Sequence, residues 1–520
     1  MLVKTFASAV LGIDAVPITV EVSSSRGVDF TLVGLPDSSV KESRDRISSA
    51  LIHSGASFPH CSLVINMAPA DIRKEGAAYD LPLAIGILAA DEKVHTTKLP
   101  HYLIMGELSL DGSLQPVRGV LPMALCARRE GFKGMILPME NTHEAAVVKG
   151  LEVLGMNNIK EVIAFLNDEL PVEPTVVDID AEFSRHAFPE DLDFSDVRGQ
   201  ENVRRALEVA AAGGHNIIMV GPPGAGKSMM AKRLPSILPP LTLDEALETT
   251  KIHSVAGLMC KRRGVSSGLE TALITQRPFR SPHHTITDVA LVGGGINPHP
   301  GEISLAHNGV LFLDELPEYK RSALEVMRQP LEDRKITVTR AKMGVEYPAG
   351  FMLVAAMNPC PCGHFGDPTH TCTCSPAAVH RYLSRISGPL LDRIDLQVPI
   401  QAVPFAELQK AEPGEPSAAI RARVLAARKI QSERFADVEN IHCNAQMTSR
   451  LLRKYCHLDE ASESMLEMAM TRLGLSARAY DRILKVSRTI ADLEGATDIS
   501  ANHLREAISY RELDKEAQWL

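Results

Sequence analysis

Residues 221–228 read Gly221-Pro222-Pro223-Gly224-Ala225-Gly226-Lys227-Ser228, between an apolar run at 217–220 and a helix-forming segment. They match the phosphate-binding pattern G-x-x-x-x-G-K-[ST] at every fixed position. Glycines let the backbone amides of such a loop curl round phosphate oxygens at a helix N-terminus. We therefore expect these residues, called the phosphate loop below, to bind ATP, with Lys227 reaching the β- and γ-phosphates and Ser228 ligating Mg²⁺.

A second apolar run, Val310 to Leu313, ends in the acidic pair Asp314 and Glu315. Ligands bind at the carboxyl ends of parallel strands, so this pair is expected beside the phosphate loop. We expect Asp314 to hold Mg²⁺, directly or through water. Glu315 is expected to orient and deprotonate the attacking water, because phosphoryl transfer needs a positioned nucleophile.

The chain of 520 residues is long enough for several folded domains. A third apolar run at 351–357 joins the first two as strands of one parallel sheet with helices between them, which predicts a doubly wound α/β core. Before this core, short strand-like runs alternate with helical patterns, and after it apolar residues recur at helical spacing. The predicted divisions are an α/β N-terminal domain at 1–168, a linker at 169–195, the core at 196–402 and a helical domain at 403–520.

Composition is that of a globular protein, with 45% apolar and 23% charged residues. The net charge is −9, but segment 166–200 alone holds ten acidic residues against two arginines. The remainder is close to neutral, so the overall charge does not exclude a nucleic-acid partner. The same acidic segment contains prolines and shows little periodicity, which is why it is predicted to be a linker.

The longest apolar stretch, Leu81 to Ala90, has about half the length that a helix needs to cross a membrane. The N-terminal residues alternate like a strand and show no cleavage site of a signal peptide. We therefore expect no membrane partner and a cytoplasmic location.

Three segments outside the nucleotide motifs are specific to one branch of ATPases: 279–285, 293–295 and 300–309. They resemble the magnesium-chelatase-like AAA+ proteins. Together with the N-terminal part and segment 474–482, the similarity extends over the whole chain and resembles the ComM/YifB family, whose ComM-type members are hexameric DNA helicases that promote branch migration in natural transformation. The resemblance implies a homo-oligomeric, hexameric ring that hydrolyses ATP and acts on single-stranded and branched DNA. The alternative is a protein-remodelling motor like the magnesium-chelatase motor subunit.

The same resemblance assigns roles to three further residues. Asn358 corresponds to sensor 1, Arg393 to an arginine finger and Arg478 to sensor 2. An arginine finger acts on the γ-phosphate of the neighbouring subunit, so Arg393 implies a ring. From the residues alone, Arg393 is equally an ion-pair partner of Asp392 or Asp395, and Arg478 a solvated helix residue.

The N-terminal part resembles the protease domain of Lon through segments 74–80 and 106–112. Lon proteases use a Ser/Lys dyad. The alignment places Ala78 at the nucleophile and Leu121 at the lysine, and neither side chain can perform acyl transfer. We expect the Lon-like fold without proteolysis.

Residues 334–347 alternate apolar and polar side chains around a turn at Met343-Gly344, which predicts a β-hairpin. In related AAA+ helicases an insertion before sensor 1 projects into the ring pore, so the resemblance implies that Arg340 and Lys342 contact DNA phosphates. The sequence alone is equally consistent with a solvated hairpin. With one Trp and 4% aromatic residues, DNA binding should follow the backbone and depend on salt.

A second insertion at 255–300 carries the basic run Lys261 to Arg263 and a histidine pair, His283 and His284. Either histidine could hydrogen-bond a phosphate or brace the loop. Because the segment is rich in Pro and Gly, we expect both to brace it.

Nine cysteines are too few for a disulfide framework, and their odd number predicts mostly reduced thiols. Four thiolates suit tetrahedral Zn²⁺, and a loop poor in apolar residues needs such a crosslink to be ordered. The C-x-C spacing leaves open a histidine ligand at His364 or His370, and free thiols or a redox switch are the other alternative. We predict a structural zinc site formed by the cysteines that gather at 360–374: Cys360, Cys362, Cys372 and Cys374.

Overall fold

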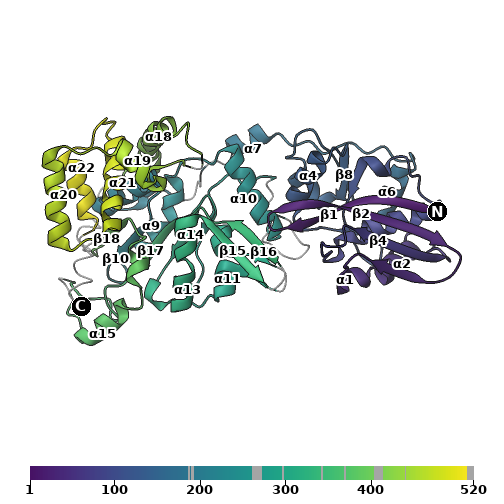
Figure 1. The fold of residues 1–520 in the computed structure, drawn as a ribbon, viewed down its shortest axis with the longest axis horizontal. Helices are drawn as coiled ribbons and strands as arrows, with labels where there is room; N and C mark the ends of the chain where they lie inside the picture. Colours follow the sequence, from purple (N-terminus) through teal and green to yellow (C-terminus); the bar gives the residue numbers. More distant parts are fainter. Residues whose placement is uncertain are drawn as a thin grey trace.

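The computed structural model describes residues 1–185, 188, 192–259, 272–295, 298–340, 343–367, 370–402, 414–439 and 441–511. Figure 1 shows an elongated molecule in which the N-terminal part forms one end, the nucleotide-binding core the middle, and the C-terminal helices the other end. No helix in these described ranges is both long and apolar enough to cross a membrane.

The N-terminal part is built on a seven-stranded mixed sheet. The long strands β1 and β2 pair antiparallel, and β5, β8 and β9 extend the sheet in parallel from β1. The apolar stretch at 81–90 forms helix α3 (Asp80–Ala90), all of whose residues are buried. The strand order is β3 (Phe30–Val33), β4 (Ser62–Ala68), β2 (Asp14–Ser25), β1 (Leu2–Leu11), β5 (Tyr102–Ile104), β8 (Gly134–Pro138) and β9 (Glu152–Met156).

The other helices of this part include α2 (Ser43–His53), α4 (Val120–Arg129) and α6 (Ile159–Leu166). Leu121 is fully buried on α4, and Ala78 lies in the short turn η1 (Ala77–Tyr79). The absence of the Ser/Lys dyad and of proteolysis stays a prediction of the alignment.

The core is a five-stranded parallel sheet in the order β11 (Phe279–Arg280), β14 (Val310–Leu313), β17 (Met352–Met357), β10 (Ile217–Val220) and β18 (Leu396–Pro399). All four pairings are parallel. The three predicted apolar runs are β10, β14 and β17, and every residue of β14 and β17 is buried. Helices α8 (Glu201–Gly213), α9 (Lys227–Arg233) and α10 (Leu243–Val255) accompany the sheet. The predicted α/β fold class is confirmed.

The described residues of the predicted linker include the short helix α7 (Ile179–Arg185). Ile179 is buried in a small apolar cluster with Val147 of the N-terminal part and Leu241 of the core. The segment is therefore ordered by apolar contacts with both of its neighbours, which its acidic composition did not reveal.

The C-terminal part consists of packed helices: α18 (Ser417–Arg434), α19 (Ser449–Tyr455), α20 (Glu460–Leu473), α21 (Ala477–Leu493) and α22 (Ala501–Ser509). Its apolar side chains share one cluster with α8 and the sheet. The predicted start of this part, residue 403, lies outside the described residues.

A buried ion pair joins the core to these helices. Asp395, at the start of β18, bonds Arg482 of α21 and lies 3.3 Å from His215 Nδ1, and it accepts the backbone N–H of Asn216 at 3.1 Å. Burial alone would raise the pKa of Asp395, but Arg482 and His215 outweigh it and hold that pKa well below its usual range.

We predict that Arg482→Met lowers the free energy of unfolding by about 3–5 kcal/mol, because it leaves Asp395 buried without its main partner. The pKa of Asp395 is depressed in the folded state, so its contribution is full above the unfolded pKa of about 3.9 and is lost as the pH falls below it. Urea unfolding at several pH values measures both effects. Arg478→Met, at an exposed site on the same helix, is the control, and equal stability of the two variants would contradict the prediction.

Candidate nucleotide site

The phosphate loop connects β10 to α9 at the carboxyl edge of the sheet. The Gly221 N–H donates to the carbonyl of Met357 at 3.2 Å, which fixes the start of the loop against β17. Gly224 and Gly226 have φ of 78° and 86°, in the left-handed region that favours glycine. The two glycines therefore allow the tight path that brings the loop into α9.

Lys227 is buried at the first position of α9 and turns back over the loop. Its Nζ donates to the carbonyl oxygens of Gly221 at 2.7 Å and Pro222 at 2.9 Å, and to Asn358 Oδ1 at 3.1 Å. Burial lowers the pKa of Lys227, whereas Asp314 and Glu315 oppose that shift. The structure thus brings the predicted sensor, Asn358, against the predicted phosphate-binding lysine.

Ser228 and Asp314 lie side by side, although they follow different strands. The Ser228 hydroxyl donates to Asp314 Oδ2 at 2.5 Å, and Asp314 Oδ1 accepts the Glu315 N–H at 2.9 Å. A hydroxyl and a carboxylate are hard oxygen ligands of the kind that Mg²⁺ prefers, so this pair fits the predicted magnesium site.

Glu315 lies two residues after the end of β14 and is accessible to solvent. Its backbone is left-handed, with φ of 52°, and its side chain is about half exposed. His284 Nδ1 lies 3.1 Å from Glu315 Oε2. The His284 ring also packs against His283, with ring centroids 4.1 Å apart. His284 is thus in contact with the predicted catalytic base.

The contact between His284 and Glu315 was not expected, because both histidines were predicted to brace their loop. The contact follows from strand β11, which is only two residues long and shows no periodic pattern in the sequence. Its register pairs Arg280 with Leu311, so the residues that follow β11 run alongside those that follow β14. His284 therefore reaches the carboxyl edge beside Glu315.

The two predicted arginines lie apart from this cluster. Arg393 is 6% exposed, donates to the Pro389 carbonyl at 2.6 Å and pairs with Glu332 Oε1 at 2.5 Å. Its ion-pair partner is therefore Glu332, and not Asp392 or Asp395, the two partners that the sequence suggested. Arg478 is exposed in the first turn of α21.

The predicted hairpin is present as β15 (Lys335–Arg340) and β16 (Met343–Pro348), which pair antiparallel. The predicted turn position is wrong, because Met343 and Gly344 are paired residues of β16. Ile336, Val338, Val345 and Tyr347 are buried, so one face of the hairpin belongs to the core and the hairpin is not simply solvated. A Cβ at Gly12 would lie 2.8 Å from Val345 Cγ1, so the hairpin packs against the turn between β1 and β2.

Of the two predicted DNA contacts, the structure describes only the backbone of Arg340. Lys342 lies outside the described residues, as does the basic run at 261–263, and the Arg340 side chain is likewise outside them. The backbone places Arg340 opposite Met343, at the last pair before the turn.

The four clustered cysteines converge although the described residues of the loop that carries them, 360–367 and 370–374, form no helix or strand. Their Sγ atoms all lie within 4.8 Å of one another, and three pairs are 3.3–3.7 Å apart. Four thiolates around zinc, with Zn–S of about 2.3 Å, stand about 3.8 Å apart, so the donor set fits a tetrahedral ion. Backbone N–H groups of His364 and Thr373 lower the pKa of Cys362 to about 5, which favours a thiolate.

The two histidines of this loop do not complete the thiol cluster. His364 Nδ1 and His370 Nδ1 lie 3.1 and 3.4 Å from Asp367 Oδ2. The loop also touches the nucleotide site, because a Cβ at Gly363 would lie 2.5 Å from Pro223 Cδ of the phosphate loop.

Family models match most of the chain. "Magnesium chelatase, subunit ChlI" matches residues 193–408, which contain the phosphate loop and the acidic pair. "Subunit ChlI of Mg-chelatase" matches residues 20–141, and "Magnesium chelatase, subunit ChlI C-terminal" matches residues 414–511.

Among curated relatives, the uncharacterized protein YifB of Escherichia coli is 45% identical over 510 residues, covering 98% of this chain and 96% of that protein. Competence protein ComM of Haemophilus influenzae is 44% identical over 510 residues, covering 97% and 96%. Lon protease 2 of Bacillus subtilis is 31% identical over 158 residues, covering 28% and 26%. Because the first two similarities extend over nearly the full length of each protein, the chain belongs to the ComM/YifB family of magnesium-chelatase-like AAA+ ATPases.

Proposed function

We propose that this chain forms a hexameric ring that couples ATP hydrolysis to movement along DNA and promotes branch migration of recombination intermediates in natural transformation. The observation that carries the ATPase part is the convergence of Lys227, Ser228, Asp314 and Glu315 at one edge of the sheet. The DNA part is supported by the full-length similarity to a competence protein and by the hairpin β15–β16.

Each residue of this site would have a separate role in ATP hydrolysis. Lys227 Nζ, now bonded to loop carbonyls and Asn358, would donate to phosphate oxygens. Ser228 and Asp314 would hold Mg²⁺, which when bound neutralises charge on the phosphates. The Glu315 carboxylate would accept the proton of the attacking water. His284, whose Nδ1 lies 3.1 Å from Glu315 Oε2, would orient that carboxylate.

Completion of the site in a ring would require Arg393 to act on a neighbouring subunit. In this chain its guanidinium is held by Glu332 and the Pro389 carbonyl. The Nε of Arg393 is buried without a hydrogen-bond partner among the described residues. We propose that ring assembly or ATP binding releases Arg393 from Glu332, so that it serves as the arginine finger. Arg478, exposed on α21, would act as sensor 2 on the subunit's own nucleotide.

We predict that Glu315→Gln retains ATP binding but loses turnover by at least about 100-fold, because the amide cannot accept the proton of water. Lys227→Ala should lose binding itself. Fluorescent-nucleotide binding and phosphate release measure the two steps. Glu318→Gln, an acidic neighbour that pairs with Arg385, is the matched control. Equal turnover of Glu315→Gln and wild type would show that Glu315 is not the base that accepts the proton of the attacking water.

The hairpin tip is expected to contribute most to DNA affinity. The double variant Arg340→Ala/Lys342→Ala should weaken binding to single-stranded and branched DNA. It should also reduce the log–log salt slope by about 0.7 for each single-strand phosphate that the protein no longer neutralises. Fluorescence anisotropy over a salt series measures this, with Lys149→Ala, an exposed lysine of the N-terminal part, as control. An unchanged affinity and slope would show that the tip does not bind DNA.

We also propose that Cys360, Cys362, Cys372 and Cys374 hold a structural zinc ion. Purified protein should then contain about one zinc per chain, and Cys360→Ser should lose the metal and lower the thermal unfolding midpoint. Cys61→Ser, outside the cluster, should do neither. Metal analysis well below one zinc per chain, with unchanged stability of Cys360→Ser, would contradict the assignment.

A further inference from the structure

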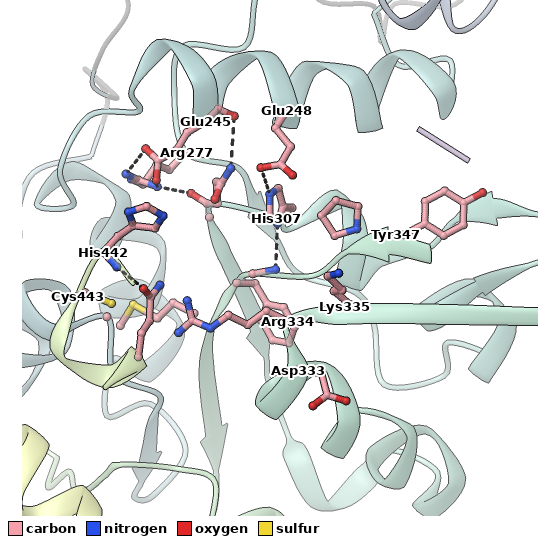
Figure 2. A pocket seen from close by; sticks show the side chains of 18 of the residues that line it. Glu245, Glu248, Arg277, His307, Asp333, Arg334, Lys335, Tyr347, His442 and Cys443 are labelled. Atoms are coloured by element: carbon pink, nitrogen blue, oxygen red, sulfur yellow. Dashed lines mark hydrogen bonds and ion pairs between the residues drawn. The ribbon is translucent and has the colours of Figure 1, made fainter. Parts of the chain in front are cut away.

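A cavity of about 690 Å³ lies at the opposite edge of the core sheet from the phosphate loop. It is lined by residues that precede the strands, such as Gly214 before β10, Gly309 before β14 and Gly350 before β17. It is also lined by Ile13 and Asp14 at the turn after β1, and by His442, Cys443 and Gln446 of the C-terminal part. Figure 2 shows His442 and Cys443 in this lining. Three parts of the chain therefore meet around one cavity, whose volume is that of a small-molecule site.

Three guanidinium groups line this cavity, and they differ in their partners. Arg277 pairs with Glu245 at 3.0 Å. Arg428, on α18, donates to the Ala211 carbonyl at 3.0 Å, and Arg334 bonds the Cys443 thiol, toward which it extends in Figure 2. Within the described part of the chain, neither Arg428 nor Arg334 forms an ion pair with a carboxylate.

Among the described residues, no carboxylate that lines this cavity pairs with Arg334 or Arg428. Burial lowers the pKa of Arg334, and the nearby Arg428 adds to that shift, whereas Cys443 and Asp395 oppose it. The acidic side chains of the lining are mostly engaged elsewhere, and Asp333 is exposed at the rim. The engaged pairs are Glu245 with Arg277, Glu248 with His307 at 3.0 Å, Glu346 with Lys335 at 3.6 Å and Asp14 with Lys251 at 3.4 Å.

The backbone of Arg334 is a second, independent observation. Its φ of 55° is left-handed, at the C-terminal end of α14 (Arg328–Asp333), where glycine is the favoured residue. A non-glycine residue in this conformation is strained, and such strain is found where the side chain serves a function. An arginine here costs both backbone strain and the partial burial of a charge that has no carboxylate partner within the described residues.

We propose that Arg334 and Arg428 bind the phosphate group of a small phosphorylated ligand at a site distinct from the phosphate loop. Guanidinium groups match phosphate oxygens with paired donors, and the cavity admits a ligand up to the size of a nucleotide. Arg334 belongs to the core and leads directly into β15, whereas Arg428 belongs to the C-terminal helices. The ligand would therefore bridge the root of the hairpin to the helical part.

The test measures thermal unfolding of the full chain in the Lys227→Ala background, which removes binding at the phosphate loop. Sodium phosphate is compared with sodium chloride at equal ionic strength, and ADP is the second probe. The unfolding midpoint should rise with phosphate or ADP, and this rise should be abolished in Arg334→Gly and in Arg428→Gln. Arg334→Gly also relieves the left-handed backbone, so it should fold at least as well as its parent. Arg450→Gln, an exposed arginine, is the control.

The two probes distinguish a free anion from a nucleotide as the ligand. A rise with phosphate alone identifies the free anion as the ligand, and a rise with ADP at lower concentrations identifies a nucleotide. No rise with either probe, or an equal rise in Arg334→Gly and Arg428→Gln, would overturn it. The proposal does not depend on DNA binding or movement, so these results are independent of the proposed function.

Discussion

The parallel pairing of β14 and β10 on either side of β17 is the constraint on which the nucleotide site depends. The register aligns Leu313 with Ala355, and Val220 with Met357. The three strands therefore end at one edge, where the phosphate loop, Asp314 and Asn358 follow them. Both faces of β14 and β17 are buried, so a strand slipped by one residue would exchange its side chains between two differently packed faces, and packing favours the register that assembles the site.

Features that short sequence patterns determine, such as apolar strands and a hairpin, were predicted correctly. The three apolar runs became β10, β14 and β17, the alternation at 334–347 became a hairpin, and the four clustered cysteines came together. Strands β11 and β18 were not predicted. Strand β11 has only two residues and so shows no periodicity, and β18 begins three residues after Arg393 with no turn signal to separate it from that segment. The partners of His284 and Arg393, and the cavity at the far edge, depend on long-range packing that no short pattern encodes.

Packed contacts join the core to the cysteine loop, the C-terminal helices and the N-terminal part. Gly363 brings the cysteine loop against Pro223, and Asp395 binds the C-terminal helices through Arg482. The hairpin in turn packs on the turn beside Gly12 of the N-terminal part. The phosphate loop is thus in direct contact with the cysteine loop, and buried contacts join the core to the helical part and to the N-terminal part.

Movement of a labelled four-way DNA junction by the purified protein with ATP decides whether the protein is a DNA motor. We expect ATP-dependent conversion of the junction by the wild-type protein, its loss in Glu315→Gln, and weaker activity as salt increases. ATP hydrolysis without binding or movement of any junction at low salt would contradict a DNA motor. That result would instead favour a motor that remodels a protein partner, as its similarity to magnesium-chelatase subunits also allows.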